Sequence, residues 1–402
     1  MGTRHPAPHE RALHGAVALA ATPVATPVVT LEASTRKRRA GAILTVDLDA
    51  IRANYRLLRA HAAPAACAAV LKSDAYGLGA APVGAALYAE GCRHYFVAHL
   101  DEGIALRESM PIDADVFVLH GAPPGTEPEF MAHNLIPVLN SLRQVAAWHT
   151  LAQAMARTLP AVLQADTGMS RMGLAPEEVE TLLAGPDLLA GVELRYLMSH
   201  LACADQSEAP MNALQLARFQ ALRARFPACP TSLANSSGIF LGAGYHGDLV
   251  RPGAALYGIA PTAGQPNPMH PVVRLSGKII QTRTILRGEH VGYSQNYTAD
   301  KTCLVATVAL GYADGWLRTM SNRGIAMVDG VPVPQIGNIS MDSITLDVSG
   351  MAPERVAPGQ LVDLICAGHP VDAVAAQAGT IAYEVLTGLG ARLHREYIGA
   401  AR

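Results

Sequence analysis

The chain has 402 residues, half of them hydrophobic, and a formal net charge of −2 at pH 7. This length exceeds what one hydrophobic core usually organises, so two domains are expected. The near-neutral charge gives no electrostatic basis for binding nucleic acid or an anionic membrane surface. No apolar run reaches the about 20 residues that a membrane-spanning helix needs.

Residues 1–40 form an Ala-, Pro- and Thr-rich segment that ends in the basic run RKRR. A secretory signal places its basic residues first and keeps proline out of its apolar part. Here Pro23 and Pro27 interrupt the apolar part, and the strongest basic run comes last. We therefore expect residues 1–40 to be a disordered extension or the product of an upstream start codon.

From residue 65 onward, short β-rich apolar runs alternate with amphipathic helical patterns. The expected strands are 65–72, 94–100, 114–121, 135–140, 160–166, 195–201, 231–236 and 249–258. Strands that alternate with helices predict βαβ units and a parallel sheet. Eight such units predict a (β/α)8 barrel, which we place at residues 41–270.

After residue 270 the pattern changes to strands joined by turns. The expected strand segments are 272–285, 303–311, 324–337 and 343–350, and Asp329-Gly330 is a hairpin signal. A helical pattern returns only at 371–390. We therefore expect a second, mainly β domain at residues 271–402.

Six cysteines are scattered through the chain without a CxxC pair or histidines at metal-ligand spacing. This usage indicates small apolar core residues in a reducing compartment, and we expect a cytoplasmic protein without a metal site.

Several polar residues stand at the carboxyl ends of expected barrel strands: Lys72, His200, Asn235 with Ser236, and Arg251. Barrel enzymes build their active sites on this face. A strand-end lysine is ordinarily a salt-bridged surface residue. In an apolar barrel mouth, however, desolvation lowers the pKa of the amine and allows it to form a Schiff base.

Two segments near these residues are suited to binding an anion. LANSSG (233–238) supplies a hydroxyl and backbone amides at an expected helix start. RPGAALYG supplies Gly253, where a backbone can approach a ligand closely. A lysine, a phosphate cradle and a barrel together suggest pyridoxal 5′-phosphate as cofactor.

The ordered motifs of the chain resemble those of the alanine racemases over residues 43–398. The motifs are VLKSDAYG, QADTGMSRMG, MSHLACAD, LANSSG, VRPGAALYG, GEHVGYS, ALGYADG and ISMDS. The resemblance implies racemisation of alanine with pyridoxal phosphate in a bacterial cytoplasm, to supply D-alanine for peptidoglycan. It also implies a homodimer in which each active site is shared.

The resemblance also implies roles for individual residues. Lys72 holds the cofactor and acts as one base, and Tyr293, contributed by the partner subunit, acts as the other. The other cofactor contacts are Tyr76, His200, Asn235, Ser236, Arg251, Gly253 and Ala254. The substrate and entrance contacts are Arg171, Met341, Tyr312 and Asp342. Taken singly, Tyr293 and Tyr312 fit domain packing. Met341 alone fits a hydrophobic core, and His200 fits a structural histidine.

Arg251 is expected to face the pyridine nitrogen, with His200 linking it toward the tyrosine base. An arginine cannot accept the ring proton, so the cofactor would be a weaker electron sink, which would suppress transamination.

The chain departs from the family pattern at several positions. Gln164 stands where many members carry a carbamylated lysine, so carbamylation is not expected, and a neutral amide would hold Arg171 less strongly than an anion. Ser73-Asp74 and Leu78 replace the commoner Ala-Asn and His. Ala391 stands where some relatives place a pocket tyrosine, and a smaller residue there would admit larger substrates.

A broad-specificity racemase is therefore an alternative. A basic amino-acid decarboxylase would bring a partner cysteine, and neither Cys303 nor Cys366 lies in such a motif. A barrel protein that only carries pyridoxal phosphate would end after the barrel, and a metal-dependent barrel hydrolase would need a ligand cluster.

Overall fold

The computed structural model describes residues 35–226 and 228–399. The expectation for residues 1–40 falls almost entirely outside them, although 35–39 are helical. The part of the chain that is described contains no helix long and apolar enough to cross a membrane.

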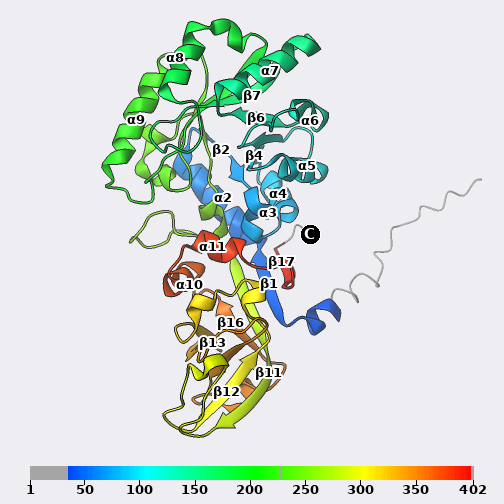
Figure 1. Ribbon diagram of the computed structural model, residues 1–402, viewed down its shortest axis with the longest axis vertical. Coiled ribbons are helices and arrows are strands. Elements are labelled where there is room, and N and C mark those ends of the chain that lie inside the picture. Colours follow the sequence, from blue (N-terminus) through cyan, green and yellow to red (C-terminus); the bar gives the residue numbers. More distant parts are fainter. Residues whose placement is uncertain (1–34, 227, 400–402) are drawn as a thin grey trace, which may run out of the picture. The chain divides into compact units, whose positions relative to one another are not determined.

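The eight expected barrel strands are all present, which confirms the barrel (Figure 1). They are β2 (Ala66–Cys67) with β3 (Ala69–Val70), β4 (His94–Val97), β5 (Asp115–Val118), β6 (Ile136–Leu139), β7 (Leu159–Gln164), β8 (Val192–Met198), β9 (Thr231–Ser232) and β10 (Leu249–Val250). Strands β3 to β9 form one parallel sheet in chain order. Strand β10 pairs in parallel with β2, and a parallel bridge joins Asn235 to Arg251, so the sheet closes on itself.

Helices follow the strands and cover the outside of the sheet (Figure 1). They are α2 (Leu48–Ala62), α4 (Ala80–Ala89), α5 (Leu100–Ser109), α6 (Glu127–Ala132), α7 (Leu142–Met155), α8 (Pro176–Ala184) and α9 (Pro210–Arg223).

Helix α7 shows how the sequence specifies these elements. Ser141 begins it by accepting a hydrogen bond from the backbone N–H of Gln144. Val145, Trp148 and Ala152, spaced to share one helix face, are buried.

The last two barrel strands are followed by short 3-10 segments instead of long helices. These are η2 (Ser237–Leu241) and η3 (Ala243–Tyr245) after β9, and η4 (Ala254–Tyr257) after β10. The helix expected to start within LANSSG is therefore a 3-10 turn.

The second domain is a mixed β structure, as expected. Its strands are β11 (Val273–Ile285), β12 (Cys303–Val308), β13 (Ile325–Val328), β14 (Val331–Pro334), β15 (Ile344–Asp347), β16 (Leu361–Ile365) and β17 (His394–Ile398). Asp329 and Gly330 have φ angles of 49° and 81° between β13 and β14, as a two-residue hairpin turn requires. The helical pattern at 371–390 is α10 (Val371–Ala378) and α11 (Ala382–Thr387).

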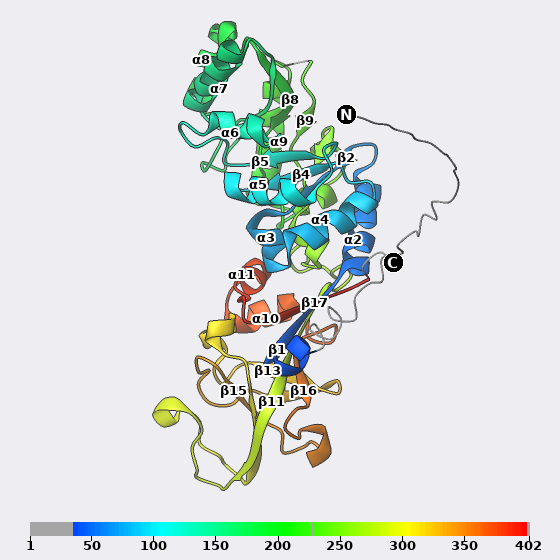
Figure 2. The same ribbon diagram turned by 90° about the vertical axis from the view of Figure 1, so that its right-hand side faces the viewer.

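The domain boundary expected at residue 41 needs correction. Strand β1 (Ala42–Asp47) precedes the barrel in sequence but pairs antiparallel with β11 and parallel with β17 (Figure 2). Residues 42–47 therefore belong to the sheet of the second domain. The assignment followed sequence adjacency, whereas the partners of β1 lie hundreds of residues away.

Candidate active site

Lys72 lies directly after strand β3, at the start of an unusual turn. In α3 (Lys72–Gly77), the residues Ser73, Asp74, Ala75 and Tyr76 all have φ between 53° and 57°. This is a left-handed turn, which costs residues other than glycine roughly 1–2 kcal/mol each. Four such residues in a row persist only where surrounding contacts fix them.

Hydrogen bonds from other parts of the chain hold this turn. The Ser73 N–H donates to Oε1 of Glu102 at 2.6 Å, and Oδ1 of Asp74 accepts from the Ala80 N–H at 2.7 Å. Strand β17 adds two contacts, because Arg395 donates to the carbonyl of Gly77 and the Tyr397 hydroxyl donates to that of Leu78. Ser73 and Asp74, which depart from the family pattern, both take part.

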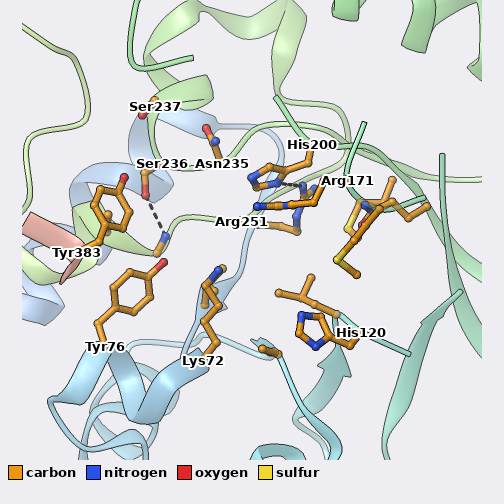
Figure 3. A pocket seen from close by; sticks show the side chains of 18 residues that line it. Lys72, Tyr76, His120, Arg171, His200, Asn235, Ser236, Ser237, Arg251 and Tyr383 are labelled. Atoms are coloured by element: carbon orange, nitrogen blue, oxygen red, sulfur yellow. Dashed lines mark hydrogen bonds between the residues drawn. The ribbon is translucent and has the colours of Figure 1, made fainter. Parts of the chain in front are cut away.

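A cavity of about 410 Å³ opens at this end of the barrel (Figure 3). Nine of the residues singled out from the sequence line it: Lys72, Tyr76, Arg171, His200, Asn235, Ser236, Arg251, Gly253 and Ala254. Three of them have basic side chains, Lys72, Arg171 and Arg251, whereas no Asp or Glu is among the lining residues. The cavity is therefore suited to an anionic ligand.

One side of the cavity is built from hydroxyl groups and a glycine (Figure 3). The Ser236 hydroxyl accepts hydrogen bonds from the N–H groups of Gly253 and Ala255, so its own hydrogen remains available to a ligand. A Cβ on Gly253 would lie 2.5 Å from the Tyr76 hydroxyl. Glycine is thus required here to make room for Tyr76. This cradle fits the phosphate group of pyridoxal phosphate.

The sequence reasoning missed Tyr383, which belongs to α11 of the second domain. Its side chain lines the cavity on the same side as Ser236 and packs on Tyr76, with ring centroids 6.0 Å apart (Figure 3). His120 and Ser237 were also missed. Ala391, in contrast, is exposed and does not line the cavity of the single chain.

Arg251 and His200 form the inner wall opposite the hydroxyl groups (Figure 3). Arg251 is 4% exposed and donates to the Ser199 carbonyl at 2.7 Å and to Nδ1 of His200 at 3.4 Å. Burial, followed by the charge of Arg251, lowers the pKa of His200 to about 3. His200 is therefore neutral near pH 7 and accepts at Nδ1, which leaves its Nε2–H to donate.

Arg171 lies on a loop that Asp166 organises. The Asp166 carboxylate accepts hydrogen bonds from the N–H groups of Gly168, Met169 and Ser170. Gln164 also lines the cavity and is 5% exposed, and no hydrogen bond joins its side chain to Arg171. The guanidinium is therefore open to an incoming carboxylate.

The environment of Lys72 favours a neutral amine. Burial, and then the charge of Arg171, lower the pKa of Lys72, and Glu102 opposes them. A neutral amine is the form that reacts with an aldehyde.

The pKa of His120 is lowered as well. Burial has the largest effect, followed by His99, Lys72 and Arg171, and Glu102 opposes them.

The remaining predicted site residues do not reach this cavity. Tyr293, Tyr312 and Met341 are 72%, 43% and 53% exposed on loops of the second domain, and Asp342 lies beside them. Domain packing therefore does not explain Tyr293. The loops contact one another, because Asn338 donates to the carbonyl of Tyr293 and the Tyr312 N–H donates to that of Ser340.

Arg392 fixes part of this exposed group. Its guanidinium binds both carboxylate oxygens of Asp314 at 2.8 Å and one oxygen of Asp342 at 2.6 Å. Within the residues described, no group of three or more His, Cys, Asp or Glu side chains is placed to hold a metal ion.

A half-buried strand-end lysine beside a phosphate cradle in a (β/α)8 barrel defines a pyridoxal-phosphate enzyme of the barrel type. Comparison with known proteins gives the family. Residues 46–261 match the model of the alanine racemase N-terminal domain, and residues 272–397 match that of the C-terminal domain. The chain belongs to the alanine racemase family, whose members are pyridoxal-phosphate-dependent isomerases.

Two relatives and two solved structures illustrate the similarity. An "Alanine racemase, catabolic" of Mesorhizobium japonicum is 52% identical over 360 residues, covering 90% of this chain and 94% of its own length. An alanine racemase of Rhodospirillum rubrum is 49% identical over 362 residues, covering 90% and 97%.

The crystal structure of alanine racemase from Bartonella henselae, with covalently bound pyridoxal phosphate, has a TM-score of 0.86 at 41% identity and covers 89% of this chain and 100% of that one. The alanine racemase structure from Streptomyces coelicolor has a TM-score of 0.85 at 32% identity and covers 90% and 99%.

Proposed function

We propose that the chain interconverts L- and D-alanine with two bases, Lys72 and Tyr293, the latter from a second copy of the chain. The observation that carries this proposal is the placement of the two residues. Lys72 lines the cavity with a lowered pKa, whereas Tyr293 is 72% exposed and does not line this cavity. Racemisation requires proton transfer at both faces of Cα, hence two bases on opposite sides.

The predicted cavity residues and Tyr383 each have a role in this scheme. Pyridoxal phosphate bound to Lys72 supplies the electron sink that acidifies the Cα proton. Tyr76, Asn235, Ser236, Gly253, Ala254 and Tyr383 hold the phosphate end, and Arg171 binds the substrate carboxylate through its open guanidinium. Lys72 Nζ takes or returns the proton at one face, and the Tyr293 hydroxyl does so at the other.

Arg251 and His200 tune this chemistry. Arg251 stays charged near pH 7, because burial lowers its pKa only to about 9. Facing the pyridine nitrogen, it would donate a hydrogen bond without giving up a proton. His200 accepts from Arg251 at Nδ1, so its Nε2–H is free to stabilise the tyrosine base in its deprotonated form.

The exposed loops of the second domain support a homodimer. Tyr293, Tyr312 and Met341 expose apolar surface that a monomer would ordinarily cover. We assign them, together with Asp342, to the entrance of the active site of a second copy. In a two-fold dimer each copy would complete the site of the other.

Mixing two inactive variants tests this arrangement. Lys72→Ala and Tyr293→Phe should each abolish racemisation, whereas refolding them together in equal amounts should restore about a quarter of the wild-type activity, because half of the dimers then hold one intact site. The same mixture kept unexchanged is the control. No recovery after exchange, or racemisation by a strictly monomeric form, would contradict the shared site.

Alanine is the favoured substrate over the broad-specificity alternative, because the relatives at 52% and 49% identity are both named alanine racemases. A panel of L-amino acids, assayed by loss of optical rotation, should show activity confined to alanine and similarly small side chains. Comparable rates with lysine or arginine would instead support the broad-specificity enzyme.

In the cell, the reaction serves either the supply of D-alanine or the consumption of alanine. Supply of D-alanine for peptidoglycan is the role that the family resemblance implies. However, two of the relatives, from Mesorhizobium japonicum and Agrobacterium fabrum, are named as catabolic, which favours alanine consumption. The six free cysteines agree with a cytoplasmic location for either role. A deletion strain that grows without D-alanine but fails on alanine as carbon source would establish the catabolic role.

A further inference from the structure

The carboxylate of Glu102 joins two separate elements next to Lys72. Glu102 lies in the first turn of α5, where Oε2 accepts hydrogen bonds from the N–H groups of Ala98 at 2.7 Å and His99 at 3.1 Å. Oε1 faces the other way and accepts from the Ser73 N–H at 2.6 Å. The Glu102 side chain thus caps the start of α5 and also accepts a hydrogen bond from the turn that carries Lys72.

The hydrogen bond from the Ser73 N–H to Glu102 lies at the start of the strained left-handed turn. Ser73 is the first of the four left-handed residues, and it is bonded directly to Lys72. Ser73 is exposed, so water could bond to its N–H, but a water molecule would not tie the start of this strained turn to α5 as the Glu102 carboxylate does. A carboxylate has acceptor positions for all three N–H groups, whereas a neutral amide has only one acceptor oxygen.

Glu102 is also the anion that acts on Lys72. The charged and titratable groups around Lys72 lie on several elements. They are Tyr76 on α3, Arg171 after β7, His120 after β5 with His99 packed on it, His200 after β8, Arg251 after β10 and Glu102 on α5. Arg171 disfavours the protonated amine, whereas Glu102 favours it. Glu102, which holds the turn, therefore also opposes the effect of Arg171 on the pKa of Lys72.

We propose that Glu102 is a positioning residue that fixes the Lys72 turn for cofactor attachment by bridging Ser73 to the start of α5. The inference rests on the proposed role of Lys72 as the cofactor lysine. Glu102 does not line the cavity, so it acts through the backbone and not by touching the ligand.

The chain offers a closely matched control in Glu178 of α8. Its Oε2 accepts from the Ala175 N–H at 3.0 Å at the start of its own helix, and its Oε1 reaches across to the Leu142 N–H at 3.1 Å. The two glutamates therefore share the same helix position, and each bridges its own helix start to another element, Glu102 with three accepted bonds and Glu178 with two. Only Glu102 bridges to the Lys72 turn.

The test compares Glu102→Gln, Glu102→Asp and Glu178→Gln with the wild-type full chain. Each protein is stripped of cofactor and titrated with pyridoxal 5′-phosphate, with the Schiff-base absorbance as the readout. Wild type and Lys72→Ala are measured first, because absence of a band in wild type, or a band that survives in Lys72→Ala, would overturn the proposed role of Lys72 itself.

Glu102→Gln should bind pyridoxal phosphate about tenfold or more weakly, since the amide cannot accept all three charge-assisted bonds. Glu102→Asp keeps the charge but is one methylene too short for the bridge, so it should also weaken binding. Glu178→Gln should bind as wild type does. Wild-type affinity in either Glu102 variant, or equal loss in Glu178→Gln, would overturn the proposal.

Two further readouts separate positioning from simple helix capping. The pH midpoint for the rate of Schiff-base formation should fall in Glu102→Gln, because the anion that favours the protonated amine is gone; an unchanged midpoint would overturn the proposal. If the variants fail to fold, hydrogen exchange on the wild-type chain decides. The Ser73 amide should be protected like those of Ala98 and His99, and exchange at the rate of an unprotected amide would overturn the bridge.

Discussion

Arg251 donates a hydrogen bond to Nδ1 of His200, with 3.4 Å between the two nitrogens, while burial keeps His200 neutral. The same guanidinium is held by the hydroxyl of Ser232 and the carbonyl of Ser199. The histidine therefore has a fixed tautomer, and the arginine a fixed direction. Arg251 and His200 together determine which groups in the cavity donate and accept protons, and substitutions of each can be tested.

Replacing Arg251 with glutamate should change the outcome of the reaction. A carboxyl group can hold a proton between itself and a ring nitrogen, whereas arginine cannot accept one. We expect Arg251→Glu to lose most racemase activity and to form more pyruvate per racemisation event, measured with lactate dehydrogenase. The cofactor absorbance verifies that the variant is loaded. An unchanged ratio of pyruvate to racemised alanine would refute this account of Arg251.

His200 should make the fold sensitive to acid. Its pKa is about 3 in the folded chain and near 6.5 when unfolded. Below pH 6.5 the unfolded state takes up the proton first, so stability is lost as the pH falls toward 3. Urea unfolding at pH 7 and pH 5 should show wild type losing about 1–2 kcal/mol more than His200→Asn. His149→Asn, on the outer helix α7, should keep the wild-type difference; equal losses in all three proteins would contradict the prediction.

Gly253 should tolerate no side chain. A methyl group there would lie 2.5 Å from the Tyr76 hydroxyl, so Tyr76 would have to leave the phosphate cradle. We expect Gly253→Ala to weaken pyridoxal phosphate binding about tenfold or more, as for the loss of a charge-assisted hydrogen bond. Gly244→Ala is the control, because the nearest atom to its new methyl group lies at 3.9 Å. Tight cofactor binding by Gly253→Ala would show that Tyr76 does not need this space.

Arg392 should affect catalysis without affecting cofactor binding. Its planar fork holds Asp314 and Asp342, and lysine cannot reproduce that geometry. We expect Arg392→Lys to lower kcat/KM severalfold through looser Tyr312 and Asp342 loops, with an unchanged cofactor titration. Arg355→Lys, which alters the ion pair with Asp329 in the same domain, should match wild type. A cofactor defect in Arg392→Lys would argue against an entrance role.

The barrel strands and the cavity residues at strand ends were predictable because their signals are local. Each strand is a short apolar run, and Lys72, His200 and Arg251 come at strand ends that a parallel barrel brings together. The left-handed turn after Lys72 was not predictable, because Glu102 and Arg395, which hold it, belong to other elements.

Tyr383 and β1 show the same limit at longer range. Tyr383 lies in an ordinary amphipathic pattern, and only the packing of α11 against the Lys72 turn brings it to the cavity. Strand β1 is a plausible strand by composition, but nothing in its sequence indicates that it pairs with β11 and β17. The exposed Tyr293 could be given a role only from family resemblance, since its proposed site lies on another copy of the chain.

The pairing of β1 with β11 and β17 also constrains how the chain folds during synthesis. The ribosome releases β1 before the barrel, yet its two neighbours emerge only after the barrel is complete, and β17 ends at Ile398. Until then β1 has two unpaired edges, so long-range closure of this sheet is a late step. Loss of the last nine residues, 394–402, would therefore expose an edge of β1, and would also remove the Arg395 and Tyr397 contacts from the Lys72 turn.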